Sequence, residues 1–105
     1  MVEHSAFRTG VTRDVPIPGG GRKTSVVVDE PGLRVVHFAL DTGQGLTEHH
    51  APKSAVVQAL TGAIDFTLEG ESRTLLPGDV VVMAPGATHA LVAREPSRFA
   101  LSLIG

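Results

Sequence analysis

Short runs of apolar residues, separated by glycine and proline, follow one another along most of the chain. Valine, leucine and isoleucine dominate these runs, and twelve glycines and seven prolines interrupt them at short intervals. No run sustains the periodicity of a long amphipathic helix. Brief strands with regular turn signals between them are typical of an all-β sandwich or barrel.

The same pattern predicts where the strands begin and end. Tight turns at Thr61-Gly62 and Glu69-Gly70 join three strands into an antiparallel meander. Turns at Pro77-Gly78 and Pro85-Gly86 lie before and after the predicted strand over residues 80–83. The predicted strands span residues 24–29, 33–40, 54–60, 63–68, 72–75, 80–83, 89–93 and 98–104, with a shorter one over 46–50.

The chain is predicted to form one barrel domain over residues 23–105, preceded by a flexible lead-in over residues 1–22. A length of 105 residues, 42% of them hydrophobic, suffices for one core and is too short for two. The lead-in ends in "PIPGGGRK". This glycine run precedes a strand and lacks a following Gly-Lys-Ser/Thr, so we do not interpret it as a phosphate-binding loop.

Composition narrows the classes of partner and of metal ligand. A net charge of −2 and the absence of lysine or arginine runs argue against nucleic acid and anionic membranes as partners. No apolar segment is long enough to span a membrane, and the first residues lack a signal-peptide pattern, so we expect a cytoplasmic protein. Because the chain has no cysteine, any metal site must use nitrogen and oxygen ligands.

The five histidines differ in their sequence context. His4 lies in the lead-in and is expected to be solvated. His37 lies in the apolar run "LRVVHFAL", where a hydrogen-bonded structural role is favoured over a ligand role. His89 begins a strand directly after a turn and is a better candidate for a site.

The stretch "TEHH" supplies the remaining candidates. In an extended strand Glu48 and His50 face the same way, while His49 faces the other. Inward side chains of neighbouring strands converge in a small barrel, so Glu48 and His50 could share one ion with His89. The residues alone leave it equally open that this stretch is an exposed polar loop end. Gln58 shares a face with Val56, which favours an interfacial role unless a bulge reverses the phase.

The segment "LLPGDVVVMAPGATHALVA" resembles the second motif of the cupin superfamily, in particular that of the small single-domain cupins of the conserved-barrel type. Gly78, Gly86 and His89 match this motif in register. Ala84 replaces its proline, and Ala93 replaces its asparagine. The resemblance extends over about residues 26–104 and implies a double-stranded β-helix, or jelly-roll barrel.

The first cupin motif is matched less completely. Counting back from Gly62 places its second histidine on His50 and its first histidine on Glu48. The motif glutamate falls on Ala55, seven residues before that glycine. The resemblance implies a metal site of two histidines and a glutamate from this motif and one histidine from the other. This chain departs from that set at two positions.

Three interpretations of the site follow. Glu48, His50 and His89 could form a two-histidine, one-carboxylate set suited to Fe(II) and acceptable to Mn, Ni or Zn. A shift of one residue in the strand would instead make His49 the inward ligand. Alternatively, the metal has been lost, and the pocket binds an organic ligand through one of the adjacent histidines, Gln58 and His89.

The resemblance implies a metal-competent barrel pocket, with Met83 at its mouth, that binds a small and largely apolar organic molecule. Dioxygenase or isomerase chemistry is the hypothesis for its activity. The alternative is a non-enzymatic ligand-binding or sensor cupin that has lost its metal. Strands that are apolar on both faces, such as those in "FALSLI", also predict a homodimer.

Overall fold

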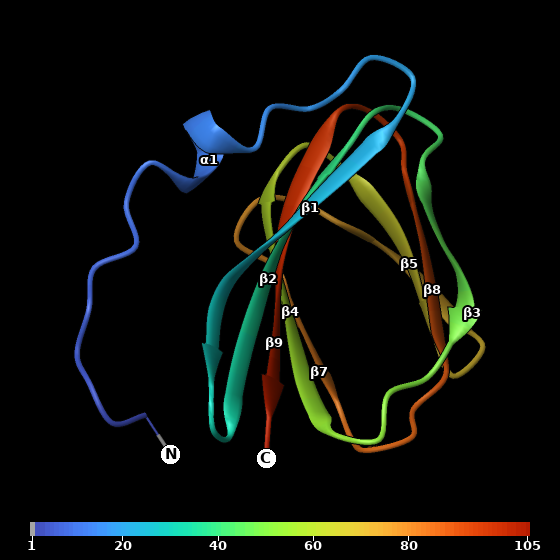
Figure 1. The fold of residues 1–105 in the computed structure, drawn as a ribbon. Coiled ribbons are helices and arrows are strands. Elements are labelled where there is room, and N and C mark those ends of the chain that lie inside the picture. The colour runs from blue at the N-terminus through green and yellow to red at the C-terminus, as the bar shows by residue number, and fades with distance from the viewer. Residues whose placement is uncertain (1) are drawn as a thin grey trace.

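In the computed structural model, which describes residues 2–105, two antiparallel sheets face each other and form a barrel (Figure 1). The strands span Arg22–Glu30 (β1), Leu33–Leu40 (β2), Gly45–His49 (β3), Ser54–Thr61 (β4), Ile64–Leu68 (β5), Glu71–Leu75 (β6), Val80–Met83 (β7), His89–Ala93 (β8) and Ser97–Ile104 (β9). One sheet has the order β1-β2-β9-β4-β7, and the other has the order β3-β8-β5-β6. The predicted all-β jelly-roll fold is confirmed, and each predicted strand is present with ends shifted by at most two residues.

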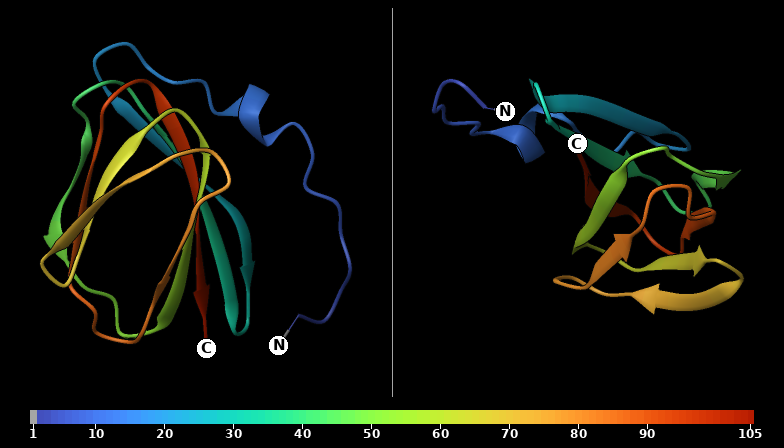
Figure 2. Two further views of the ribbon diagram at one scale, coloured as in Figure 1. Left: turned by 180° about the vertical axis from the view of Figure 1, so that it is seen from behind. Right: turned by 90° about the horizontal axis from the view of Figure 1, so that it is seen from below.

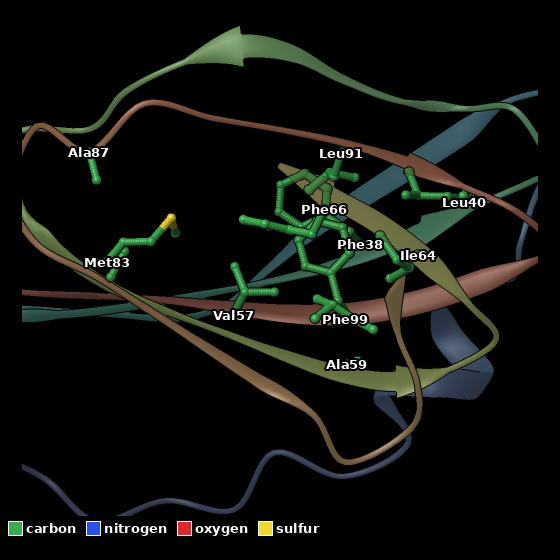
Figure 3. Packing of buried hydrophobic residues seen from close by; sticks show 13 residues of the cluster. Phe38, Leu40, Val57, Ala59, Ile64, Phe66, Met83, Ala87, Leu91 and Phe99 are labelled. Atoms are coloured by element: carbon green, nitrogen blue, oxygen red, sulfur yellow. The ribbon is translucent and has the colours of Figure 1, made fainter. Parts of the chain in front are cut away.

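The core lies between the inner faces of the two sheets (Figure 3). Phe38 of β2 and Phe99 of β9 stack at its centre, with ring centroids 4.4 Å apart. Leu40, Val57 and Ile64 surround them and are almost fully buried. Each large apolar side chain buried in this way contributes about 1.5–3 kcal/mol to folding, which makes this cluster the main source of stability.

The N-terminal segment runs along the outside of the five-stranded sheet, as two further views show (Figure 2). It contains one short helix, α1 (Val11–Asp14), and the side chains of residues 2–9 are exposed. Val15 is the buried residue of this segment, with only 3% of its surface exposed. The predicted lead-in is also attached to the barrel through Arg8, whose Nε donates to the Val27 carbonyl at 2.9 Å. Its first residue lies outside the described part of the chain.

A buried arginine holds the segment in place. Nη1 of Arg98, on the outer face of β9, donates hydrogen bonds to the Val15 carbonyl at 2.6 Å and to Nε2 of His37 at 3.0 Å. Because a guanidinium can only donate, Nε2 of His37 must be an unprotonated acceptor. The structural role predicted for His37 is confirmed.

Across residues 2–105, no helix is long and apolar enough to cross a membrane. The cytoplasmic location and the lack of nucleic-acid partners stay predictions.

The His37–Arg98 contact predicts how stability depends on pH. Burial, and secondarily the positive charge of Arg98, lower the pKa of His37 from its usual 6.5. Below pH 6.5 the unfolded chain binds a proton that the folded chain still excludes, so stability is full above this pH and falls as pH decreases. Urea unfolding between about pH 5 and pH 8 should show a smaller loss for His37→Gln than for the native protein.

Exposed His4 provides the matched control, and His4→Gln should retain the native pH dependence. The pKa of His89 is also lowered, so His37→Gln should remove only part of the slope. An unchanged slope in His37→Gln would contradict the assignment.

Candidate functional site

The pairing of β3 with β8 contains one irregularity. Leu46 lies opposite Leu91 and His49 lies opposite His89, so β3 has one residue more than β8 over this stretch. A β-bulge of this kind reverses the alternation of side chains beyond it. Leu46 packs against the core, and His49 is the residue of β3 that shares a face with His89.

His49 and His89 are in ring contact. Their centroids are 4.0 Å apart, and the ring planes are inclined by 58°. Nδ1 of His49 donates to the Thr47 carbonyl at 2.8 Å, and Nδ1 of His89 donates to the Ala87 carbonyl at 3.1 Å. Since a carbonyl can only accept, both Nδ1 atoms carry the proton and both Nε2 atoms keep a free lone pair. Metal-binding histidines are oriented in this way by their outer hydrogen bonds.

His89 is the buried member of the pair, with 6% of its surface exposed. Its ring lies parallel to that of Phe66 on β5, with centroids 5.9 Å apart. Burial lowers the pKa of His89 most, the neighbouring rings of His49 and His50 lower it further, and the hydrogen bond to Ala87 acts in the opposite direction. His89 is consequently neutral at physiological pH, which is the form that binds metals.

The structure does not bring Glu48, His50 and His89 together as one set. Glu48 is exposed on β3, on the face opposite to His49, and His50 is exposed just beyond the strand. Within residues 2–105, no group of three or more histidine or carboxylate side chains has an arrangement that could hold a metal. Strict alternation favoured Glu48 and His50, whereas the bulge brings His49, which is also exposed, opposite His89. Which of these residues binds a metal stays a prediction.

The five-stranded sheet contributes apolar side chains to the barrel interior through β4 and β7. Ala55, at the position of the family's glutamate, is 2% exposed and lies opposite Met83 in the register of β4 with β7. Met83 is itself buried in the core cluster rather than exposed at the mouth. Gln58 is exposed and lies opposite Val80, on the outer face of β4, so it does not line the interior.

A pocket of about 210 Å³ opens between the edge strands β6 and β7. Phe66, Leu68, Leu75 and Val81 line it on the barrel side. Phe66 therefore lines this pocket and also stacks on His89. Sequence reasoning identified neither Phe66 nor the pocket, because both depend on how β5, β6 and β7 are placed in space.

The chain matches no model of a known protein family and no curated protein. Solved structures do resemble it. KdgF from a Halomonas species is 31% identical, with a TM-score of 0.75 over 81% of this chain and 80% of that chain. An RmlC-like cupin from Shewanella frigidimarina is 22% identical, with a TM-score of 0.80 over 98% of this chain and 91% of that chain. This chain belongs to the cupin superfamily.

A third solved structure also matches nearly the whole cupin chain. SPY1581, a conserved protein of unknown function from Streptococcus pyogenes, is 29% identical, with a TM-score of 0.83. The match covers 98% of this cupin and 90% of the streptococcal chain. The similarity thus includes the N-terminal segment as well as the barrel.

Gly45 permits the close approach of β3 to β8 on which the histidine contact depends. A Cβ atom at this position would collide with the backbone carbonyl of Leu91. Gly45→Ala should therefore lower the free energy of unfolding by about 1–3 kcal/mol, as measured by urea denaturation. Gly19→Ala is the control, because a Cβ there meets open space. Equal stability of the two variants would contradict this role of Gly45.

Proposed function

We propose that this cupin holds a divalent transition metal with His49 and His89 and binds a small organic molecule in its barrel. The observation that carries the proposal is the pair of free Nε2 lone pairs on two histidine rings in contact. Imidazole nitrogen suits Zn, Ni and Fe and is acceptable to Mn. His50 lies just beyond β3, and its imidazole lowers the pKa of His89.

The residues around the His49–His89 pair have different proposed roles. When bound, the metal supplies Lewis-acid or dioxygen chemistry, as an isomerase or a dioxygenase requires. Phe66 shields one face of His89 from water and fixes the orientation of its ring. His50 is exposed and outside the ring contact, so its imidazole is available to carry a proton to or from the ligand.

A non-enzymatic ligand-binding cupin is the second candidate, and one observation favours it. Ala55 places a methyl group where the family usually has a carboxylate, so the two neutral imidazoles leave the charge of a divalent ion uncompensated. The metal affinity should be lower than that of a four-ligand site. Without metal, the barrel would retain the ligand pocket and lose the chemistry.

Metal content distinguishes the two candidates. The protein is incubated with Fe(II), Mn(II), Ni(II) or Zn(II) and desalted. Elemental analysis should then find at least one of these metals still bound, at up to about one ion per chain. His49→Ala and His89→Ala should each lose most of it, because two donors are the minimum here. Glu48→Gln, the matched control on the same strand, should retain it.

Two results would contradict this assignment. Native protein that keeps less than about one ion per ten chains with every metal supports the non-enzymatic alternative. Equal, mild losses in His49→Ala and His50→Ala would show that the bulged register does not set the ligand.

We also propose that the cupin is a homodimer that pairs through the outer face of the five-stranded sheet. Val82 is 73% exposed on this face, Val80 is 52% exposed and Ile104 is 48% exposed. In the register, Val82 lies opposite the half-buried Val56 of β4. Apolar side chains gathered on one face are covered favourably by a second copy.

A charge in this patch should separate the protomers. Val82→Lys should lower the mass found by light scattering from about twice 10.9 kDa to that of one chain. Val26→Lys tests the specificity of the effect, because Val26 is 47% exposed on the distant edge strand β1. A native protein that is already monomeric, or equal dissociation of both variants, would refute the proposed interface.

A further inference from the structure

Edge strand β6 carries two charged side chains on its barrel-facing side. In the register of β5 with β6, Arg73 lies opposite Phe66 and Glu71 lies opposite Leu68. Cross-strand partners share a face of the sheet, and both Phe66 and Leu68 contribute to the core or pack against it. Ser72 and Thr74 alternate with these two residues along β6 and are on the other face, where Thr74 hydrogen-bonds to Asp65.

Arg73 and Glu71 both line the 210 Å³ pocket between β6 and β7, together with Phe66. The volume is below the range of about 300–1,000 Å³ that is usual for drug-sized ligands, so the occupant must be small. Its floor is apolar, and the charged groups of the lining come from β6 alone. An occupant that matches this surface has an apolar body and one charged end.

Most N–H donors of the Arg73 guanidinium form no hydrogen bond to another described residue. Its Nη2 donates to Oε1 of Glu71 at 2.7 Å, which is the one hydrogen bond of this side chain to another described residue. Five N–H groups are present on an arginine, and their planar arrangement matches the two oxygens of a carboxylate. The side chain is 74% exposed, so an incoming anion can reach it.

We propose that Arg73 binds the carboxylate of a small apolar acid whose body lies on Phe66. Phe66 also stacks on His89, so the bound acid and His89 would contact the same ring. The inference deepens the proposed function, on which it rests, by assigning the ligand to small monocarboxylic acids. Inward-pointing charges also protect exposed edge strands from pairing with other chains, and the experiment must separate these two roles.

The probes are benzoate and benzamide, which share size and ring and differ in charge. Backbone amide shifts in heteronuclear NMR titrations should give an affinity for benzoate at least about tenfold above that for benzamide, with the largest changes in β5, β6 and β7. Arg73→Gln should remove this preference. Arg73→Lys should retain part of it, because lysine keeps the charge without the two-pronged geometry.

Arg94→Gln is the matched control. Arg94 also forms an exposed ion pair, with Asp65 at 2.9 Å, and does not line the pocket. This variant should keep the native preference for benzoate. Equal loss in both arginine variants, a native preference in Arg73→Gln, or no benzoate binding by the native protein would each overturn the inference. Aggregation of Arg73→Gln with its benzoate preference intact would assign Arg73 to edge protection instead.

Metal content measured on the same samples keeps this test apart from the proposed function. Arg73→Gln should hold as much metal as the native protein, because Arg73 is not among the proposed ligands. Native protein that binds metal and benzamide but does not prefer benzoate would refute the carboxylate assignment alone. If the native protein holds no metal after incubation and desalting, the metal centre is refuted. The benzoate titrations then still decide whether Arg73 binds a carboxylate.

Discussion

One extra residue in β3 determines which of its side chains meets His89 of β8. Leu46 must face the core, where it packs against the buried cluster. Without the bulge, alternation from Leu46 would turn His49 outward and place Glu48 inside. With the bulge, His49 lies opposite His89 and the two rings meet at 4.0 Å. The candidate site is therefore a product of strand register, and the rest of its chemistry follows from it.

The strands could be predicted from the sequence because their signals are local. Turn residues such as Pro77-Gly78 and the apolar runs between them set each boundary to within two residues. The bulge has no comparable local signal, since it depends on pairing with β8, some forty residues further along the chain. Gly45 carries a hint, because a glycine inside a strand often marks close backbone approach. That hint points to contact with a neighbour and does not say which histidine will turn inward.

Two buried histidines show why residue type alone does not separate a structural histidine from a candidate metal ligand. Burial lowers the pKa of both His37 and His89, so both are neutral. Nε2 of His37 accepts a hydrogen bond from Arg98, which lies 61 positions away in the chain, and its lone pair is thereby used. In His89 the hydrogen bond is made at Nδ1, to the carbonyl of Ala87, and Nε2 stays free. A structural and a ligand-competent histidine thus differ in which nitrogen is occupied.

The two sheets contribute unequally to the interior near the histidine pair. His49 and His89 come from the four-stranded sheet, whereas the five-stranded sheet supplies Ala55 and Met83. Ala55 stands where the family usually has a carboxylate, so this position offers no negative charge to compensate a bound cation. The pocket of Phe66 and Arg73 also combines an apolar floor with charged groups on one side, which is why the ligand proposed for it has an apolar body and one charged end.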